Sequence, residues 1–387
     1  ITIKLENRVV HIFLSPCTHE SRMFKEVNTL QSVGFSRNLL IVGLWNPGLL
    51  EKENYSSFCK IFRLRILSFF FPRNKFFSVI KYFEWCLRLF FCVGKLKTDL
   101  IHAHGLKSLP AAVALKFFTG ASLIYDAHEL ETECNGLSGV IQKISKLIEF
   151  LLIGFADGTM VVSDSIAFHY KAKYQGINPI VVRNIPNLSG AQMPMIPIRK
   201  KLGLKTNDCL FLYLGGLVPG RGIEALLNTF SKLQCNHHLL LVGGGVLEGR
   251  VSASVSSSNR IHWIPPVSPT EVLAYAKEAD VGLCFIEDIC LSYRYSLPNK
   301  LFEYLLAGLP VAVYDLPEQE KIVRKYDCGW VLTREVSAFS MFFESLTKEV
   351  IKTKKSGVER ASTELDWRNE EQIYLSLCRS VLLSRHS

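Results

Sequence analysis

The chain has 387 residues, of which 48% are hydrophobic and 21% are charged, and its formal net charge is +10. This composition fits a globular protein with room for two domains and excludes a disordered or collagen-like chain. The eleven cysteines form no CxxC pair and their number is odd, which indicates reduced thiols rather than a disulfide framework or a zinc cluster. The sequence shows no signal peptide and no apolar run of about 20 residues, so we expect a cytoplasmic protein without a membrane span.

Short apolar segments alternate with helical patterns through the first half of the chain. Strands are predicted at residues 9–14, 39–42, 100–102, 122–125, 159–162 and 180–182, and helices at 21–32, 109–118, 141–155 and 166–174. Such an alternation predicts a parallel, doubly wound sheet, in which ligand-binding groups gather at the carboxyl ends of the strands.

The segment from Ser57 to Lys97 interrupts this alternation and is both basic and aromatic. It carries nine lysines and arginines against the single acid Glu84, together with a series of phenylalanines. Cations interleaved with large aromatic side chains are typical of proteins that lie on an anionic bilayer. No nucleic-acid-binding motif accompanies the segment, so we do not expect nucleic acid as a partner. The alternative is that the aromatic residues belong to the core and the cations to an ordinary surface.

A second alternation follows residues 187–207, which lack periodicity and are predicted to be a linker. Strands are predicted at 209–214, 239–242, 261–264, 281–285, 311–314 and 330–332, and helices at 269–278 and from about Asp366 to Leu383. Ser268 and Glu271 suit a capping box at the start of the first of these helices. We therefore expect an N-terminal domain at 1–186, a C-terminal domain at 208–365 and a terminal helix at 366–387.

The stretch SLPNKLFEYLLAGLPVAVYD, residues 296–315, combines a helix with a polar face and a buried strand. Pro298 and Asn299 are start signals for the helix, and Gly308 followed by Pro310 is a stop signal. One side of the helix is apolar, whereas the other side carries Ser296, Asn299, Lys300 and Glu303. Such a helix N-terminus with an ammonium beside it favours an anion such as a phosphate. The alternative is an ordinary amphipathic helix with a solvated polar face.

The wording PNKLFEYLLAGLPV resembles the donor-site signature of the GT-B glycosyltransferases of family 4, which are retaining sugar transferases. The resemblance implies an α/β fold with two Rossmann-like domains that face a central cleft. It also implies a last helix that crosses back to the N-terminal domain, and DWRNEEQ resembles that crossing. The sequence departs from the family pattern at Tyr295, where the family has a second glutamate, and at Gly216, where it often has an additional arginine.

In the second half, the resemblance implies a site for a nucleotide-diphosphate sugar that needs no metal and no other cofactor. The glutamate that matches Glu303 binds the nucleotide ribose, the helix N-terminus holds the diphosphate, and Arg221 in GRGIEALL matches a phosphate-binding cation. Glycines that follow strands let the backbone approach a ligand closely. The expected donor-binding residues are Gly215, Gly216, Arg221, Gly243, Gly244, Asn299, Lys300, Leu301 and Glu303.

In the first half, the resemblance implies the acceptor side of the reaction. His128 in YDAHE resembles the histidine that contacts the transferred sugar, so we expect His128, Arg221 and Lys300 to be the catalytic residues. The expected acceptor-binding residues are Thr18, Glu20, Arg22 and His104, whereas His102 is expected to be structural.

These observations predict a retaining hexosyltransferase that acts on a saccharide acceptor, which we expect to be lipid-linked. The basic and aromatic segment predicts a peripheral protein on the inner face of the cell membrane, in the synthesis of a bacterial surface polysaccharide such as capsule or O-antigen. Two alternatives stay open at this point. A nucleotide-sugar 2-epimerase shares the fold, and a non-enzymatic sugar-nucleotide binding protein would be consistent with Tyr295 and Gly216.

Overall fold

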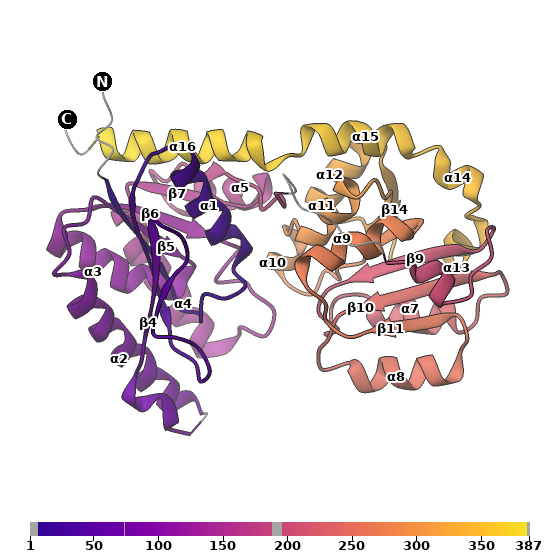
Figure 1. Cartoon of the computed structure of the whole chain (residues 1–387), viewed down its shortest axis with the longest axis horizontal. Coiled ribbons are helices and arrows are strands. Elements are labelled where there is room, and N and C mark those ends of the chain that lie inside the picture. Colours follow the sequence, from indigo (N-terminus) through magenta and orange to yellow (C-terminus); the bar gives the residue numbers. More distant parts are fainter. Residues whose placement is uncertain (1–6, 73, 188–195, 385–387) are drawn as a thin grey trace. The chain divides into compact units, whose positions relative to one another are not determined.

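The computed structural model describes residues 7–72, 74–187 and 196–384, and its helices and strands are labelled in Figure 1. The chain divides into two compact units, each with its own sheet. The first unit comprises residues 1–183 together with 370–387, and the second comprises residues 184–369. The predicted linker lies partly outside the described residues, because residues 188–195 fall in the gap.

The first unit is built on an eight-stranded sheet in the order β3-β4-β2-β1-β5-β6-β7-β8, in which β3 alone runs antiparallel to its neighbour. The central strands β5 and β6 are buried along their whole length, as parallel strands covered by helices on both faces require. The strands are β1 (Arg8–Phe13), β2 (Asn38–Leu44), β3 (Lys52–Asn54), β4 (Cys59–Leu64), β5 (Leu100–His104), β6 (Ser122–Ala127), β7 (Gly158–Val161) and β8 (Ile180–Val181).

The helices of the first unit connect these strands, and short 3-10 turns lie next to three of them. They are α1 (Ser21–Ser32), η1 (Leu67–Phe70), α2 (Lys75–Val93), η2 (Leu106–Ser108), α3 (Leu109–Thr119), α4 (Gly139–Leu152), η3 (Ile153–Phe155) and α5 (Asp164–Lys173).

The long helix α16 (Trp367–Leu383) packs on the first unit, although it follows the second unit in the sequence. The Ser122 hydroxyl donates to the carbonyl of Val381 at 3.2 Å, and the Tyr374 hydroxyl lies 3.3 Å from Nδ1 of His102. A Cβ atom added at Gly158 would come within 2.9 Å of Leu377 and Val381, so the helix lies directly against the sheet. The predicted crossing of the C-terminal helix to the N-terminal domain is therefore confirmed.

The second unit is built on a six-stranded, fully parallel sheet in the order β11-β10-β9-β12-β13-β14. The strands are β9 (Cys209–Leu214), β10 (His237–Val242), β11 (Ile261–Ile264), β12 (Val281–Cys284), β13 (Val311–Tyr314) and β14 (Gly329–Leu332). The helices are α6 (Ile198–Lys201), α7 (Ile223–Phe230), α8 (Glu248–Ser257), α9 (Pro269–Glu278), α10 (Leu291–Arg294), α11 (Asn299–Leu306), α12 (Pro317–Tyr326), α13 (Val336–Ser345), α14 (Lys348–Lys352) and α15 (Lys355–Glu364). Two sheets of this kind confirm the predicted fold class.

Most predicted elements agree with the observed ones, and α9 begins with the predicted capping box of Ser268 and Glu271. The segment from Ser57 to Lys97 differs from its description as an interruption, since it folds into β4, η1 and α2. Helix α2 was missed because apolar residues occur on both of its sides, so its sequence shows no single apolar stripe.

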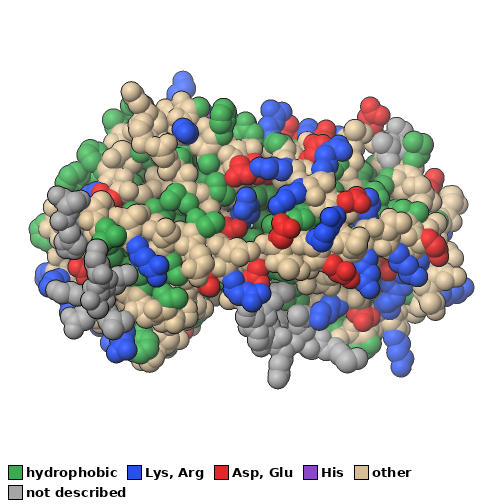
Figure 2. Space-filling view, turned by 90° about the horizontal axis from the view of Figure 1, so that it is seen from above, with side chains coloured by type: hydrophobic (Ala, Val, Ile, Leu, Met, Phe, Trp, Pro, Cys, Tyr) green, Lys and Arg blue, Asp and Glu red, His purple; other side chains and the backbone are tan. Residues whose placement is uncertain are grey.

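Charged side chains are unevenly spread over the surface. On the face shown in Figure 2, acidic and basic side chains are interspersed in the right-hand half, whereas hydrophobic and uncharged groups prevail in the left-hand half. Within the described residues, no helix combines the length and the apolarity that crossing a bilayer would take.

Candidate functional site

Two cations of the second unit lie beside the glycine turn that follows β9. Lys300 is in the first turn of α11, whose capping position is Pro298, and Arg221 precedes α7. The ammonium of Lys300 lies 3.6 Å from the ring centroid of Tyr213, and the guanidinium of Arg221 lies 4.4 Å from that of Tyr293. Burial is the main reason that the pKa of Lys300 falls to about 8, with Arg221 as a further cause. Both cations are half-buried, so this part of the unit gathers positive charge at a partly accessible place.

The glycines of the two turns that follow β9 and β10 serve different purposes. Gly243, after β10, has a φ of +147°, and a Cβ there would lie 2.0 Å from the carbonyl oxygen of Gly215, so the two turns are in backbone contact. Gly216 does not adopt a positive φ, and a Cβ there would meet only the side chain of Val218 at 3.9 Å. The backbone conformation and the close contact with Gly215 thus require glycine at 243, whereas the lack of a side chain at Gly216 leaves open space beside the cations.

Three further predicted donor residues belong to α11, and their roles as donor contacts stay predictions. The side chain of Leu301 is fully buried in the core, so only its backbone is left to face a ligand. Asn299 does not cap the helix, because its Oδ1 accepts a hydrogen bond from Nδ2 of Asn184 at 2.8 Å. Glu303 is half-buried one turn further along.

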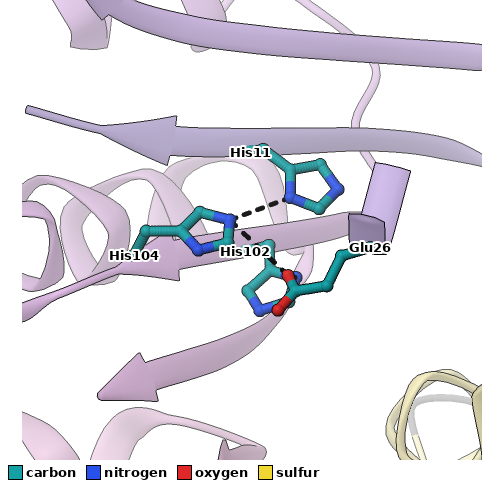
Figure 3. Close-up of side chains that lie close together, drawn as sticks. All are labelled: His11, Glu26, His102 and His104. Atoms are coloured by element: carbon teal, nitrogen blue, oxygen red, sulfur yellow. Dashed lines mark hydrogen bonds and ion pairs between the residues drawn. The ribbon is translucent and has the colours of Figure 1, made fainter. Parts of the chain in front are cut away.

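The first unit contains a buried cluster of histidines next to a glutamate (Figure 3). His11 on β1 and His102 and His104 on β5 share one face of the sheet, and Glu26 reaches them from α1. The Nδ1 of His11 lies 2.9 Å from Nε2 of His104, and Oε2 of Glu26 lies 3.6 Å from Nδ1 of His102. Burial, with the charge of Asp126 as a second cause, raises the pKa of Glu26 well above its usual value.

Asp126, at the end of β6, connects this cluster to His128. Its carboxylate accepts three hydrogen bonds of 2.8 to 3.1 Å from the guanidinium of Arg22, and it lies 2.9 Å from Nε2 of His128 and 3.2 Å from Nδ1 of His104. Burial alone would raise the pKa of Asp126, but Arg22 and His128 hold it well below its usual range. His128 is the partly exposed member of this network, and the others are buried.

Arg22 and His104 therefore differ from their predicted role as acceptor contacts. Arg22 is 3% exposed and also donates to the carbonyl of Val182 at 2.6 Å, and His104 has no exposed surface. Both are parts of the network that holds His128, because burial leaves them no surface for an acceptor sugar. The alternation of side chains along β6 could have pointed to Asp126, which is two residues before His128.

The histidine cluster brings together side chains that commonly bind metals, as do His104, Asp126 and His128. The geometry does not favour an ion in the first group. The rings of His102 and His104 are stacked, with planes 16° apart and centroids 4.5 Å apart, so their lone pairs do not converge on one point. The cation Arg22, whose Nε lies 3.4 Å from Oε1 of Glu26, opposes a second positive charge there.

The predicted acceptor loop precedes α1, with Thr18 exposed and Glu20 half-buried. Arg63 of β4 holds this loop by donating to the carbonyls of Pro16 at 2.6 Å and Cys17 at 3.1 Å. Arg63 is therefore buried, so it does not contribute to the basic surface that the sequence of segment 57–97 predicts. Thr18 and Glu20 stay predictions.

Comparison with known proteins finds a family match for the second unit. Residues 208–348 match the family of glycosyl transferases, group 1. A protein of Bacillus subtilis (strain 168), named as a candidate teichuronic acid biosynthesis glycosyltransferase TuaH, is 25% identical over 221 residues, which cover 53% of each chain. The chain thus matches only about half the length of this curated relative.

Two solved structures resemble the whole chain. Sucrose-phosphate synthase from Thermosynechococcus elongatus has a TM-score of 0.80 at 18% identity and covers 98% of this chain and 100% of its own. HepE from Anabaena, solved in complex with UDP and glucose, has a TM-score of 0.74 at 13% identity and covers 97% and 100%. At such identities the likeness shows the GT-B fold. The second unit therefore matches the glycosyl transferases, group 1, and the chain as a whole shares the fold of these two structures.

Proposed function

We propose that this protein transfers a sugar from a nucleotide-diphosphate sugar to a saccharide acceptor with retention of configuration. The observation that carries the proposal is the pair Lys300 and Arg221 beside the open turn at Gly216. In the part of the chain that the structure describes, neither cation forms an ion pair with a carboxylate, so both are available to an anionic ligand. The UDP bound to HepE is consistent with such a ligand.

The chemistry follows from where charge develops. When the bond between C1 of the sugar and the diphosphate oxygen breaks, its electron pair stays on the diphosphate, and Lys300 and Arg221 stabilise that charge. The acceptor hydroxyl attacks C1 from the same face, and its proton passes to the departing phosphate oxygen. No separate general base is then required. His128 contacts the transferred sugar, and Glu303 binds the nucleotide ribose.

Removal of either cation tests this assignment. We expect Lys300→Ala and Arg221→Ala each to lower turnover on the order of a hundredfold, because each removes one group that stabilises the leaving diphosphate. Lys277→Ala, which removes an exposed lysine of the same unit, is the matched control. A loss of less than threefold in both variants would contradict the assignment.

The two alternatives are separated by simpler measurements. A thermal-shift panel of UDP, GDP and other nucleoside diphosphates identifies the donor base, since selective binding stabilises the folded state. Incubation with the donor alone then separates transfer from epimerisation, because an epimerase makes a new sugar nucleotide without an acceptor. Binding without turnover under all acceptor conditions would favour the non-enzymatic reading.

We further propose that the protein works on an anionic membrane surface. Helix α2 exposes an apolar stripe at helical spacing, made of Phe76, Val79, Phe83, Leu87 and Phe91, whose exposed fractions are 54 to 69%. The opposite stripe, Trp85, Leu89 and Val93, is fully buried. A helix with a buried apolar face does not need a second one in water, so the exposed stripe suits insertion at a lipid interface.

Two neighbouring helices extend this apolar surface. Phe118 of α3 lies against Phe90 of α2 with ring centroids 4.9 Å apart, and Phe117 of α3 lies against Phe155 of η3, which follows α4. Helix α4 exposes a further stripe, formed by Val140, Ile141, Ile144, Leu147 and Leu151. The sequence segment 57–97 therefore covers only part of this apolar surface, because α4 begins about forty residues after the segment ends.

The acceptor proposal rests on this surface. An enzyme that modifies free sugars does not need an apolar and cationic helix face, whereas one that extends a lipid-linked saccharide must reach the bilayer. The name of the TuaH relative, which refers to teichuronic acid biosynthesis, supports a role in bacterial surface polysaccharides. Capsule and O-antigen are polymers of that kind, and the inner face of the cell membrane is then the place of action.

Vesicle co-sedimentation tests the membrane proposal. We expect binding to anionic vesicles that weakens at high salt, and we expect Phe83→Glu together with Leu87→Glu to reduce it by at least tenfold. Met341→Glu, an exposed apolar position in the second unit, is the matched control. Equal binding to neutral and anionic vesicles, together with full activity on a free-sugar acceptor, would overturn the proposal and leave the transferase assignment intact.

A further inference from the structure

We propose that Tyr213 is a positioning residue that holds the ammonium of Lys300 where it meets the diphosphate of the donor. This inference rests on the proposed function and adds to it a residue that the sequence did not indicate, because a tyrosine in the buried strand β9 resembles any other core residue.

The ring of Tyr213 is held rigidly. Its side chain is fully buried, and its hydroxyl donates to the carbonyl of Gly216 at 2.8 Å. The next residue, Leu214, donates its backbone N–H to the hydroxyl of Tyr304 at 2.8 Å, which fixes the end of β9 to α11. The strand that carries the ring and the helix that carries Lys300 are thus joined directly.

The ammonium of Lys300 lies in a narrow place between this ring and the glycine turn. Its Nζ is 3.6 Å from the ring centroid, well inside the range of about 6 Å at which a cation is attracted to an aromatic face. On the turn side, a Cβ added at Gly215 would lie 3.7 Å from both Cε and Nζ. Tyr213 on one side and Gly215 on the other therefore limit the positions that the ammonium of Lys300 can take.

The other groups near Lys300 do not replace this partner. Arg221 repels the ammonium, Glu303 attracts it without an ion-pair contact, and the thiol of Cys284 is neutral because burial raises its pKa to about 11. The ring face, 3.6 Å from Nζ, is thus a direct contact that stabilises the charged form. Arg221 repeats the arrangement on Tyr293, where the ring centroid lies 4.4 Å away.

Substitutions at 213 test the role by calorimetric titration with UDP and GDP at several pH values. Tyr213→Phe keeps the ring, so we expect its affinity to stay within threefold of wild type. Tyr213→Leu removes the ring, so we expect about tenfold weaker binding and an alkaline loss of binding that begins at lower pH. In a Lys300→Ala background, Tyr213→Leu should cause no further loss, because the ring acts through the ammonium.

Since Tyr213→Leu can also disturb folding, a second series keeps the shape of the ring. Phenylalanine analogues with one, two and three ring fluorines at position 213 should weaken binding in steps, because fluorine withdraws charge from the ring face. Tyr326→Leu is the matched control, since Tyr326 carries Lys325 over its ring at 4.5 Å elsewhere in the same unit.

The outcomes separate this inference from the proposed function. If wild type binds no nucleoside diphosphate, the proposed function fails. If wild type binds but fluorination has no effect, or Tyr213→Leu still weakens binding without Lys300, then Tyr213 is merely structural and the inference is wrong.

Discussion

At the scale of single residues, Asp126 is the centre of the first unit's polar network. It is fully buried, and its charge is balanced by Arg22 and shared with two histidines.

Removal of one partner from a buried ion pair leaves the other unpaired. Asp126→Asn should therefore lower the free energy of unfolding by about 3–5 kcal/mol, measured by urea denaturation. Asp157→Asn alters the partly exposed pair with Lys116 and should cost about 1 kcal/mol or less. Equal losses in both variants would contradict the central role of Asp126.

The histidine cluster gives the protein a predictable response to acid. Burial lowers the pKa of His104 from 6.5 to about 4, and it lowers the pKa values of His11 and His102 as well. Between pH 4 and pH 6.5 the unfolded chain binds more protons than the native one. The free energy of unfolding therefore rises with pH across this range, and this stability is lost as the pH falls from 6.5 towards 4. For His104 the full effect is about 3 kcal/mol. Urea unfolding at pH 7 and 5 should show a smaller acid loss in His104→Gln, whereas His19→Gln, which removes an exposed histidine, should match wild type.

At the scale of elements, α4 is fastened to the first unit through Glu149. This buried carboxylate accepts hydrogen bonds from the hydroxyls of Tyr125, Tyr170 and Tyr174 at 3.0, 2.6 and 2.5 Å. Three hydroxyl donors on one carboxylate hold the helix while its other side stays apolar and exposed.

Replacement of this carboxylate should loosen the helix. An amide has one oxygen acceptor in place of two and adds donors where three hydroxyls already donate, so Glu149→Gln should cost about 2–4 kcal/mol. Hydrogen exchange should show loss of protection in α4, residues 139–152, with little change in the second unit. Tyr174→Phe removes one donor and should have a smaller effect. Unchanged exchange in α4 would show that the helix is held by apolar packing alone.

The sequence predicted the elements of both sheets well where polar and apolar residues alternate with a clear period. It predicted α1 at its observed residues and the strand and helix of the 296–315 stretch nearly so. It failed where tertiary contacts decide. Helix α2 is apolar on two sides, Arg63 is a cation that the fold buries, and Tyr213 acts through a lysine about ninety residues away. None of these contacts leaves a local pattern in the sequence.

At the scale of the whole molecule, the first unit is discontinuous, because it needs α16 from the far end of the chain. Deletion of residues 370–387 would uncover the buried surface around His102, Ser122 and Gly158. We expect limited proteolysis of this variant to degrade the first unit while residues 184–369 survive as a resistant fragment. Alanine at the exposed Arg368 in the intact chain serves as the control. Equal resistance of the two units would mean that α16 is dispensable for the first.

The docking of α16 also sets an order of events during synthesis. The 186 residues of the second unit, 184–369, leave the ribosome between the two parts of the first. At about 5–20 residues per second, the sheet of the first unit waits about 10–40 s for the helix that covers it. During that interval its uncovered face is available to chaperones or to another nascent chain. The first unit is therefore completed after the second, and factors that protect nascent chains should matter more for its yield than for that of the second unit.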